Sequence, residues 1–199
     1  MLNLDQVITE FMDMLRGIAK GRAQLEMDLQ AEGQTVVAVR QQLEQVLLNL
    51  VSNSCHALDA RPEPQCQEPA IITLSTRTIH LPADRIEGTG AVCRAGDYID
   101  LQVSDNGAGM SDEVRERALQ PFFSTRKQGT GHGLGLATVK NIVMQHHGCL
   151  RLDSVLGEGT TFCLHLPIRI LATVAEGPQL TGSLRSGREP LGERARAQG

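Results

Sequence analysis

The sequence is poor in aromatic residues and contains no long hydrophobic run. Phe, Tyr and Trp make up 3% of the 199 residues, and Trp is absent. Hydrophobic residues reach 41% overall, so the chain can form a core, and that core must consist mainly of Leu, Val and Ile. No apolar stretch approaches the about 20 residues that a membrane-spanning helix needs. The composition therefore predicts one ordinary domain with additional segments and no membrane span.

The sequence also lacks a basic surplus, a secretion signal and closely spaced cysteines. A formal net charge of -4 argues against a dominant nucleic-acid-binding surface. Residues 1–15 carry acids within an apolar pattern and no preceding basic region, unlike a secretory signal. The cysteines are odd in number and show no CxxC spacing, which argues against a disulfide framework or a zinc site, so we expect reduced thiols and a cytoplasmic location. They are Cys55, Cys66, Cys93, Cys149 and Cys163.

Hydrophobic patterning predicts three longer helices and a largely antiparallel sheet. The helices are expected at 7–18, 41–60 and 133–147, with a short capped helix at 111–119. Strands are expected at 24–29, 35–39, 71–79, 98–103, 149–154 and 160–166. These elements predict an α+β sandwich with helices on one face of the sheet.

The chain divides into three segments by composition. We expect residues 1–20 to form a helix that leads into the domain and residues 21–167 to form the domain itself. Residues 168–199 are expected to be a disordered tail or linker, because residues 177–199 are rich in Gly, Arg and Glu and contain few large apolar side chains.

Two asparagines interrupt the apolar stripe of the helix expected at 41–60. Asn49 and Asn53 are four residues apart, so both side chains lie on the same side of the helix. Amides at the edge of a buried stripe need polar partners. Mg²⁺ and phosphate oxygens would supply them, because Mg²⁺ prefers oxygen ligands. Taken alone, the pair also fits two amides that are hydrogen-bonded to the backbone.

An Asp-Asn-Gly-Ala-Gly-Met segment, residues 105–110, directly follows an expected strand. The carboxylate of Asp105 at the strand end could accept a hydrogen bond from an exocyclic amine. Gly107 and Gly109 would let the backbone approach a flat base closely. By itself, the segment also fits an ordinary turn.

A glycine-rich segment, residues 129–136, leads into the helix expected at 133–147 and reads Gly-Thr-Gly-His-Gly-Leu-Gly-Leu. Glycines ahead of a helix expose backbone N–H groups, and the helix dipole favours an anion there. The pattern therefore predicts a cradle for a triphosphate, with a flexible connector as the alternative. It lacks the Gly-Lys-Ser/Thr of a Walker loop, and it follows a loop where a dinucleotide-binding fingerprint would follow a strand.

A fourth motif, residues 157–162, reads Gly-Glu-Gly-Thr-Thr-Phe and by itself fits a hairpin turn with a strand behind it. In order, spacing and type, the four motifs together resemble the N, F and G boxes of the GHKL ATPases, which adopt the Bergerat fold. The resemblance covers roughly residues 7–167. Leu-Glu-Gln-Val-Leu-Leu-Asn-Leu in the first motif, Pro-Phe-Phe-Ser-Thr before the glycines and Gly-Leu-Gly-Leu-Ala within them are similar to the histidine-kinase branch.

The resemblance implies a two-layer α/β domain that binds ATP and Mg²⁺. Asn53 would ligate Mg²⁺, with Asn49 helping to hold the metal–phosphate unit. Asp105 would bind the adenine amine, with Thr160 sharing a bridging water. Phe122 and Phe123 would anchor a lid over the nucleotide, and no side chain is implied as a general base. The further residues implied in nucleotide binding are Gly107, Gly109, Lys127, Gly131, Gly133, Leu134 and Gly135.

Two features depart from the histidine-kinase pattern. Many such kinases carry Lys or Arg three residues after the metal-binding Asn and then Tyr or Phe, whereas this chain has His56 and Ala57. The adenine therefore loses a stacking ring. The phosphoacceptor histidine, which precedes Glu or Asp on a helical hairpin before the catalytic domain, is not found among the six histidines. We therefore expect a fragment of a longer kinase or a module that acts on a partner in trans.

The function that the resemblance implies is transfer of the ATP γ-phosphate to a histidine on a separate dimerisation hairpin, in a two-component phosphorelay. The partners would be that hairpin and a response-regulator receiver, and the chain could be the cytoplasmic part of a membrane-associated sensor. One alternative is an ATP-hydrolysing clamp, which in related families uses an acidic residue where this chain has Asn49. Others are a nucleotide-binding regulatory module without kinase activity and a serine kinase of the same fold.

Overall fold

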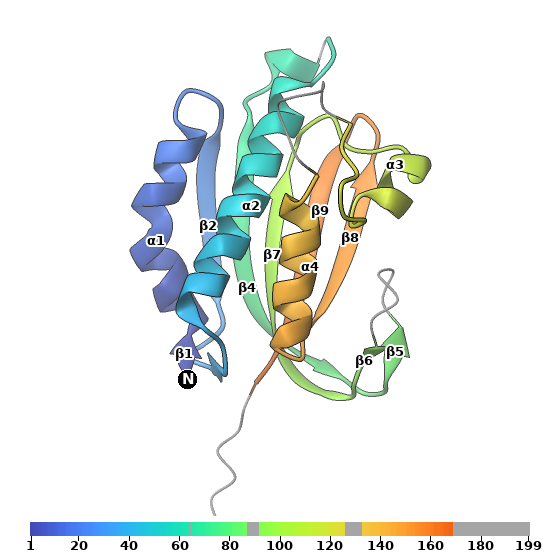
Figure 1. Cartoon of the computed structure of the whole chain (residues 1–199). Helices are drawn as coiled ribbons and strands as arrows, with labels where there is room; N and C mark the ends of the chain where they lie inside the picture. Colours follow the sequence, from blue (N-terminus) through green and yellow to red (C-terminus); the bar gives the residue numbers. More distant parts are fainter. Residues whose placement is uncertain (64, 87–91, 126–132, 169–199) are drawn as a thin grey trace, which may run out of the picture. The chain divides into compact units, whose positions relative to one another are not determined.

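The computed structural model describes residues 1–63, 65–86, 92–125 and 133–168. Within these ranges, three helices cover one face of a five-stranded sheet (Figure 1). They are α1 (Leu4–Ala19), α2 (Arg40–Asp59) and α4 (Gly135–Gln145). The short helix α3 (Asp112–Arg117) begins at Ser111, whose Oγ accepts a hydrogen bond from the backbone N–H of Val114. The predicted α+β sandwich with helices on one face is confirmed.

The strand order in the main sheet is β2-β4-β7-β9-β8. β2 pairs with β4 in parallel, and the other neighbouring strands are antiparallel. The bounds are Gln24–Gln30 for β2, Ile71–Leu81 for β4, Gly96–Asp105 for β7, Cys149–Val155 for β8 and Gly159–Pro167 for β9. The smaller elements are β1 (Leu2–Asn3) paired with β3 (Thr35–Val36), β5 (Arg85–Ile86) paired with β6 (Val92–Cys93), and the 3-10 helix η1 (Gln65–Gln67).

The hydrophobic core lies between the helices and the sheet. Alternate residues of the central strands point into it, as a strand period of two requires. From the sheet come Ile72, Leu74, Leu101, Val103, Phe162 and Leu164, and from α2 come Leu43, Val46, Leu47, Leu50, Val51 and Leu58. A partly buried polar contact adds to this packing, because Asp5 at the start of α1 accepts hydrogen bonds from Thr76 Oγ1 at 2.6 Å and from the Ala31 N–H at 3.1 Å.

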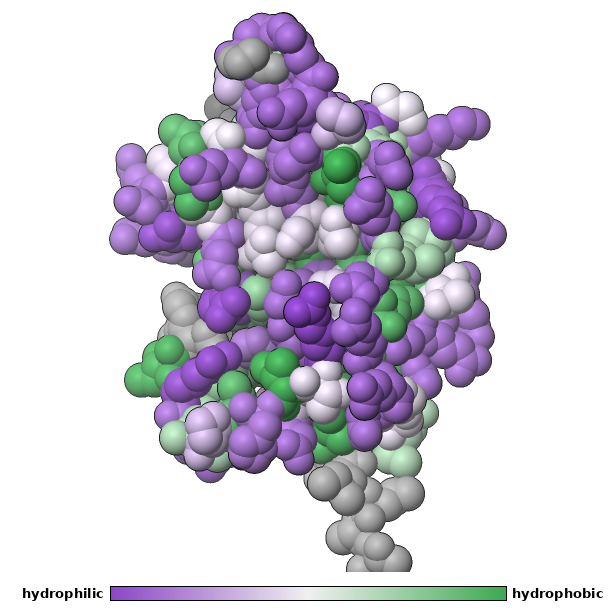
Figure 2. Space-filling model, turned by 180° about the vertical axis from the view of Figure 1, so that it is seen from behind, coloured by the Kyte–Doolittle hydropathy of each residue, from purple (hydrophilic) through white to green (hydrophobic). Residues whose placement is uncertain are grey.

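The opposite face of the sheet is mostly hydrophilic (Figure 2). Its central strands carry polar residues in register, such as Ser104 opposite Thr161, whose hydroxyls are 2.7 Å apart. The exception is a small apolar cluster of Leu81, Cys93, Tyr98 and Cys149. Among the described helices, none combines the length and apolar composition of a membrane-spanning segment.

The structure corrects three local expectations. The strand expected at 35–39 ends at Val36, where it pairs with the unexpected β1. The segment between β4 and β7, where no strand was expected, contains β5 and β6. Cys93 and Cys149 form a disulfide with a Cα–Cα distance of 5.7 Å. The expectation of reduced thiols is therefore wrong for this pair, because 56 residues of sequence separation conceal a contact that spacing rules do not detect.

Candidate functional site

A cleft of about 840 Å³ opens beside α2 at the start of α4. Its lining includes six of the residues expected at a nucleotide site: Asn49, Asn53, Gly109, Gly133, Leu134 and Gly135. Asp105, Gly107 and Thr160 are buried next to the lining residues and do not line the cleft themselves. Lys127 and Gly131 lie outside the described residues. The fold thus brings residues from α2, the segment after β7 and the start of α4 to one cleft.

Asp105 ends β7 and is held by three hydrogen-bond donors. Its Oδ2 accepts from Ser54 Oγ at 2.7 Å, its Oδ1 accepts from the Gly107 N–H at 3.0 Å, and the Thr160 N–H also donates to the carboxylate. Thr160 stands directly opposite Asp105 in the β7–β9 register. A carboxylate has about four lone-pair sites. One acceptor position therefore remains for a donor from a ligand.

Burial raises the pKa of Asp105 above its ordinary value, and the hydrogen bonds from Ser54, Gly107 and Thr160 oppose that shift. A raised pKa means that the native state holds the proton more tightly than the unfolded chain does. The contribution of Asp105 to stability is therefore largest at low pH and falls as the pH rises through the folded-state pKa. At neutral pH the buried carboxylate therefore lowers the free energy of unfolding, as expected for a group whose role is to bind a ligand.

The glycines after β7 occupy positions where a side chain does not fit. A Cβ on Gly107 would lie 2.7 Å from the Ala57 Cβ and 2.7 Å from Asp105 Oδ1. Gly109 has a φ of +63°, and a Cβ there would overlap the Val155 carbonyl oxygen. The Ala108 N–H donates to the Ala57 carbonyl at 2.9 Å. These contacts hold the segment close to α2, where Ala108, Gly109 and Met110 line the cleft.

Asn49 and Asn53 lie on the cleft side of α2 and face the start of α4. A Cβ on Gly135 would lie 3.8 Å from Asn49 Oδ1 and 4.0 Å from Asn53 Nδ2. Gln45 Nε2 donates to Asn49 Oδ1 at 3.2 Å, so this amide has a side-chain partner on its own helix. Both asparagines are half-buried. The spacing of four residues therefore places both amides on one wall, as predicted.

The first backbone N–H groups of α4 lie at the same wall and have no side-chain cap. Leu134 occupies the N-cap position without a side-chain cap, and the first helical hydrogen bond runs from the Thr138 N–H to the Leu134 carbonyl at 2.9 Å. Gly133 has a φ of +66°, and a Cβ there would lie 2.5 Å from the carbonyl carbon of Phe122. An uncapped helix N-terminus with this polarity favours an anion.

The two phenylalanines before the glycines differ in role. Phe123 lines the cleft, and the guanidinium of Arg117 lies 4.4 Å from its ring centroid. Phe122 is 78% exposed, and it is attached through its backbone N–H, which donates to the Gly133 carbonyl at 2.9 Å. Phe123 therefore makes contacts suited to an anchor, whereas the ring of Phe122, at a φ of 66°, is exposed. Residues 126–132 of the lid that both were expected to anchor lie outside the described residues.

The described residues that line the cleft include no Lys, Arg, Asp or Glu. Among these residues, His56 alone has a titratable side chain. Ala57, Ala108, Met110, Val114 and Leu156 form an apolar portion. An apolar portion next to uncapped backbone donors and amides suits a ligand with a flat apolar part and an anionic part.

Sequence reasoning missed two residues that support the site. Ser54 is buried and donates to Asp105, and Ser154 Oγ lies 2.9 Å from Thr160 Oγ1. A signal existed for Ser54, since it is four residues from Leu50 and from Leu58 on the buried stripe of α2. A polar residue on such a stripe needs a buried partner. The Asn106 side chain proves structural, because it bonds the backbone of Ile71 and Pro69.

Comparison with known proteins agrees with this geometry. Residues 38–170 match the family described as histidine kinase-, DNA gyrase B- and HSP90-like ATPase. The chain is 36% identical over 166 residues to the sensor kinase CckA of Brucella abortus (strain 2308), which covers 83% of this chain and 17% of the relative. It is 33% identical over 168 residues to the sensor histidine kinase ZraS of Klebsiella oxytoca, covering 84% and 31%. The chain thus spans less than a third of the length of these relatives.

Solved structures support the fold. The full-length ShkA structure in complex with AMPPNP aligns with a TM-score of 0.60 at 20% identity, covering 84% of this chain and 30% of that one. At this identity the likeness concerns the fold alone. The family match extends over most of the chain, including the whole of α2, the strand end at Asp105 and the start of α4. This chain belongs to the histidine kinase-, DNA gyrase B- and HSP90-like ATPase family.

Proposed function

We propose that this chain is the ATP-binding catalytic domain of a sensor histidine kinase and that it transfers the γ-phosphate of ATP to a histidine on a separate dimerisation hairpin. The observation that carries the proposal is the meeting of Asn49, Asn53 and the uncapped start of α4 in one cleft, with Asp105 buried behind its apolar portion. The sensor kinases among the relatives support the choice of histidine kinase within the family.

The residues around Asp105 would bind the adenine. Its remaining acceptor position would take a hydrogen bond from the exocyclic amine, while Ser54, Gly107 and Thr160 fix the carboxylate. Gly109 and the apolar side chains Ala57 and Met110 would lie against the base. The small Ala57 leaves the base without a stacking ring from α2, so most of the specificity would come from Asp105.

The other end of the cleft would bind the phosphates. The N–H groups of the first turn of α4, with Gly133, Leu134 and Gly135, would donate to phosphate oxygens. Gly131 and Lys127, expected to contact phosphate, remain part of the proposal. The described lining holds no Lys or Arg, so the negative charge of a triphosphate requires neutralisation by another group.

The residues present fit a magnesium ion in that place. Asn53 would supply an amide oxygen ligand and Asn49 would position the phosphates beside it, an oxygen-only arrangement of the kind that Mg²⁺ prefers. The bound ion would supply charge neutralisation for the transferring phosphoryl group. Asn53 holds no charge of its own, so nucleotide binding should depend strongly on the divalent ion.

The same residues favour transfer to a histidine over hydrolysis. No carboxylate lines the described part of the cleft, and Glu44 on α2 is engaged by Arg40, with 2.8 Å between Nε and Oε1. No residue is therefore assigned as a general base, and catalysis would rest on positioning and charge neutralisation. His146 accepts a hydrogen bond from the Val39 N–H and His165 is buried, so neither is presented as a phosphoacceptor.

The partners would be a histidine-bearing dimerisation hairpin and the receiver domain of a response regulator. We further propose that residues 21–167 form the catalytic domain, with residues 1–20 leading into it and residues 168–199 as a linker. A cytoplasmic location follows from the same proposal, since ATP and receiver domains would be available there.

A phosphotransfer assay tests the function. The chain is incubated with labelled ATP and Mg²⁺, alone and together with a hairpin domain from a related sensor kinase such as ZraS. We expect acid-labile label on the hairpin, absent when Asn53→Ala replaces the parent, and no label on this chain. Label on a histidine of this chain, including His56 at the cleft, would contradict transfer in trans. Phosphoserine would indicate a serine kinase, free phosphate an ATPase, and binding without transfer a regulatory module.

A further inference from the structure

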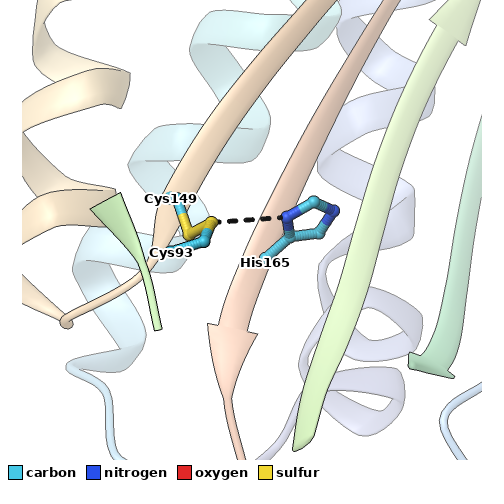
Figure 3. Close-up of side chains that lie close together, drawn as sticks. All are labelled: Cys93, Cys149 and His165. Atoms are coloured by element: carbon cyan, nitrogen blue, oxygen red, sulfur yellow. Dashed lines mark hydrogen bonds between the residues drawn. A yellow bond between two sulfur atoms is a disulfide. The ribbon is translucent and has the colours of Figure 1, made fainter. Parts of the chain in front are cut away.

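A second cluster of chemically active side chains lies on the sheet face that turns away from α1, α2 and α4 (Figure 3). Cys149 in β8 stands opposite His165 in β9, and His165 stands opposite Asp100 in β7. The residues one position along, Leu150 and Leu164, point into the core on the helix side. Because neighbours in a strand point to opposite faces, the row from Cys149 to Asp100 lies on the other face, separate from the nucleotide cleft.

Cys93 of β6 completes this row from a segment inserted between β4 and β7. Its Sγ lies 3.8 Å from His165 Nδ1, and the ligand atoms of Cys93, Cys149 and His165 all lie within 4.8 Å of one another. In a tetrahedral zinc site, bonds of about 2.3 Å to sulfur and about 2.0 Å to nitrogen separate neighbouring ligand atoms by about 3.5 to 3.8 Å. The distance from Cys93 Sγ to His165 Nδ1 matches this separation, and the two sulfurs, which are joined in the disulfide, would move apart to it after reduction.

His165 is oriented as a metal-binding histidine would be. Its Nε2 lies 3.3 Å from Asp100 Oδ1, and the other oxygen of Asp100 accepts from Gln102 Nε2 at 2.6 Å. Asp100 Oδ1 is buried without a hydrogen-bond partner among the described residues, so this oxygen could accept a proton carried on Nε2. That tautomer would leave the lone pair of Nδ1 directed towards the sulfurs. Arg85 Nη2 lies 3.5 Å from the same Nδ1, which agrees with Nδ1 as the acceptor. Carboxylate support of the second ring nitrogen is the usual arrangement for histidine ligands of metals.

Burying polar and ionisable side chains costs free energy of folding, so a buried cluster of them points to a function. Cys93, Cys149 and His165 are 0%, 1% and 2% exposed, and Asp100 is 6% exposed. The disulfide between Cys93 and Cys149 does not need polar neighbours to hold β6 to the sheet. A buried imidazole and carboxylate beside the sulfurs cost free energy that an apolar pair would avoid. Two sulfurs and one imidazole select a thiophilic cation such as Zn²⁺ over Mg²⁺ or Ca²⁺.

We propose that Cys93, Cys149 and His165, once the cysteines are reduced, bind one Zn²⁺-like cation, with water in the fourth position and Asp100 as the positioning residue for His165. Reduction of the disulfide by a dithiol uses two electrons and two protons, and the dithiol becomes a disulfide. The cation then displaces two thiol protons, so the two thiolates balance its charge. Arg85 is exposed, so its side chain can turn into solvent when the cation occupies Nδ1. The bound cation would hold β5 and β6 against the sheet in a reducing compartment, as the disulfide does in an oxidising one.

The test uses Co²⁺ as a spectroscopic probe on the full chain. The protein is reduced with a dithiol, freed of it without oxygen and titrated with CoCl₂, with ZnCl₂ as competitor. We expect one Co²⁺ per chain, a thiolate-to-cobalt charge-transfer band, intense visible bands of a tetrahedral site and displacement by Zn²⁺. Cys149→Ser and His165→Gln should abolish the charge-transfer band or the tetrahedral spectrum. Asp100→Asn should keep the thiolate band and weaken the affinity about 10- to 100-fold.

Cys163→Ser is the matched control. Cys163 lies two residues before His165 on the same strand and is buried, and burial raises the pKa of its thiol to about 11. It should bind Co²⁺ like the parent chain. The proposal is overturned if the reduced protein gives no thiolate band, or if the band survives Cys149→Ser or is lost in Cys163→Ser. It is also overturned if Cys93 and Cys149 stay unlabelled when the folded protein is treated with a dithiol and then unfolded in an alkylating agent, because the disulfide would then resist reduction in the folded chain. If Asp100→Asn folds and binds Co²⁺ as tightly as the parent chain, Asp100 does not position His165. The orientation of His165 then no longer supports the proposal.

Discussion

Asp105→Asn separates the cost of the buried carboxylate from its use in binding. The substitution keeps the size of the side chain and removes its charge. The amide oxygen can still accept from the Gly107 N–H, and the new Nδ2 can donate to Ser54 Oγ, since a hydroxyl accepts as well as it donates. Because burial raises the pKa of Asp105, we expect the variant to be at least as stable as the parent at neutral pH.

Binding of ATP should respond in the opposite direction. Loss of a hydrogen bond to a charged acceptor costs about 1.5 to 3 kcal/mol, which corresponds to an about 10- to 150-fold increase in Kd. Isothermal titration with a non-hydrolysable ATP analogue in excess Mg²⁺ measures this change. Asp153→Asn is the control, because it removes the same charge from an exposed position on β8 and should change the Kd by less than about twofold.

The pH dependence of stability gives a second readout for the same residue. The raised pKa predicts that the parent loses stability relative to Asp105→Asn as the pH rises through the folded-state pKa of Asp105, and that the difference disappears in more acidic solution. Urea unfolding at several pH values measures the difference. A folded variant with an unchanged Kd would refute the adenine contact. A variant that is less stable than the parent at every pH would refute the inference that the buried carboxylate of Asp105 destabilises the fold.

Three further predictions concern the cleft. Asn53→Ala should remove the Mg²⁺-dependent part of nucleotide binding. It should change the free energy of unfolding by less than about 1 kcal/mol, because the side chain is half-buried at a polar edge. Equal binding with and without Mg²⁺ in the parent would contradict the metal role, and unfolding of the variant would make Asn53 structural. Gly109→Ala should lower the free energy of unfolding in urea by more than about 1 kcal/mol, because Gly109 has a φ of +63° and an added Cβ would overlap Val155. Gly17→Ala within α1 is the control. Nothing lies within 4 Å of an added Cβ there, so the free energy of unfolding should rise by about 0.5 to 1 kcal/mol. Amide hydrogen exchange at residues 122–125 and 133–136 should slow when Mg²⁺ and ATP are added, since phosphate contacts order the start of α4; equal protection in both states would argue against a phosphate site there.

Local sequence patterns predicted much of the site. The four-residue spacing of Asn49 and Asn53 determines their common direction on α2, because side chains four apart share a helix face. The strand before Asp105 and the helix after the glycines followed from periodicity, and both are present in the structure. The chain order of these motifs was enough to identify the family. The asparagine pair, the strand and the helix each depend on residues that are close together in the sequence, where backbone geometry leaves few alternatives, whereas the family depends on the order of motifs spread along the chain.

Contacts between distant segments were decided by the tertiary structure alone. Ser54 meets Asp105 across 51 residues. Cys93 meets Cys149 and His165 only because β5 and β6 form within the β4–β7 connection and because β8 and β9 pair in a particular register. A strand register and a loop path depend on packing across the whole sheet. The sequence by itself therefore determined the family and the helix-borne parts of the nucleotide cleft, whereas the partners of Asp105 and the sulfur–imidazole cluster depended on how the strands align.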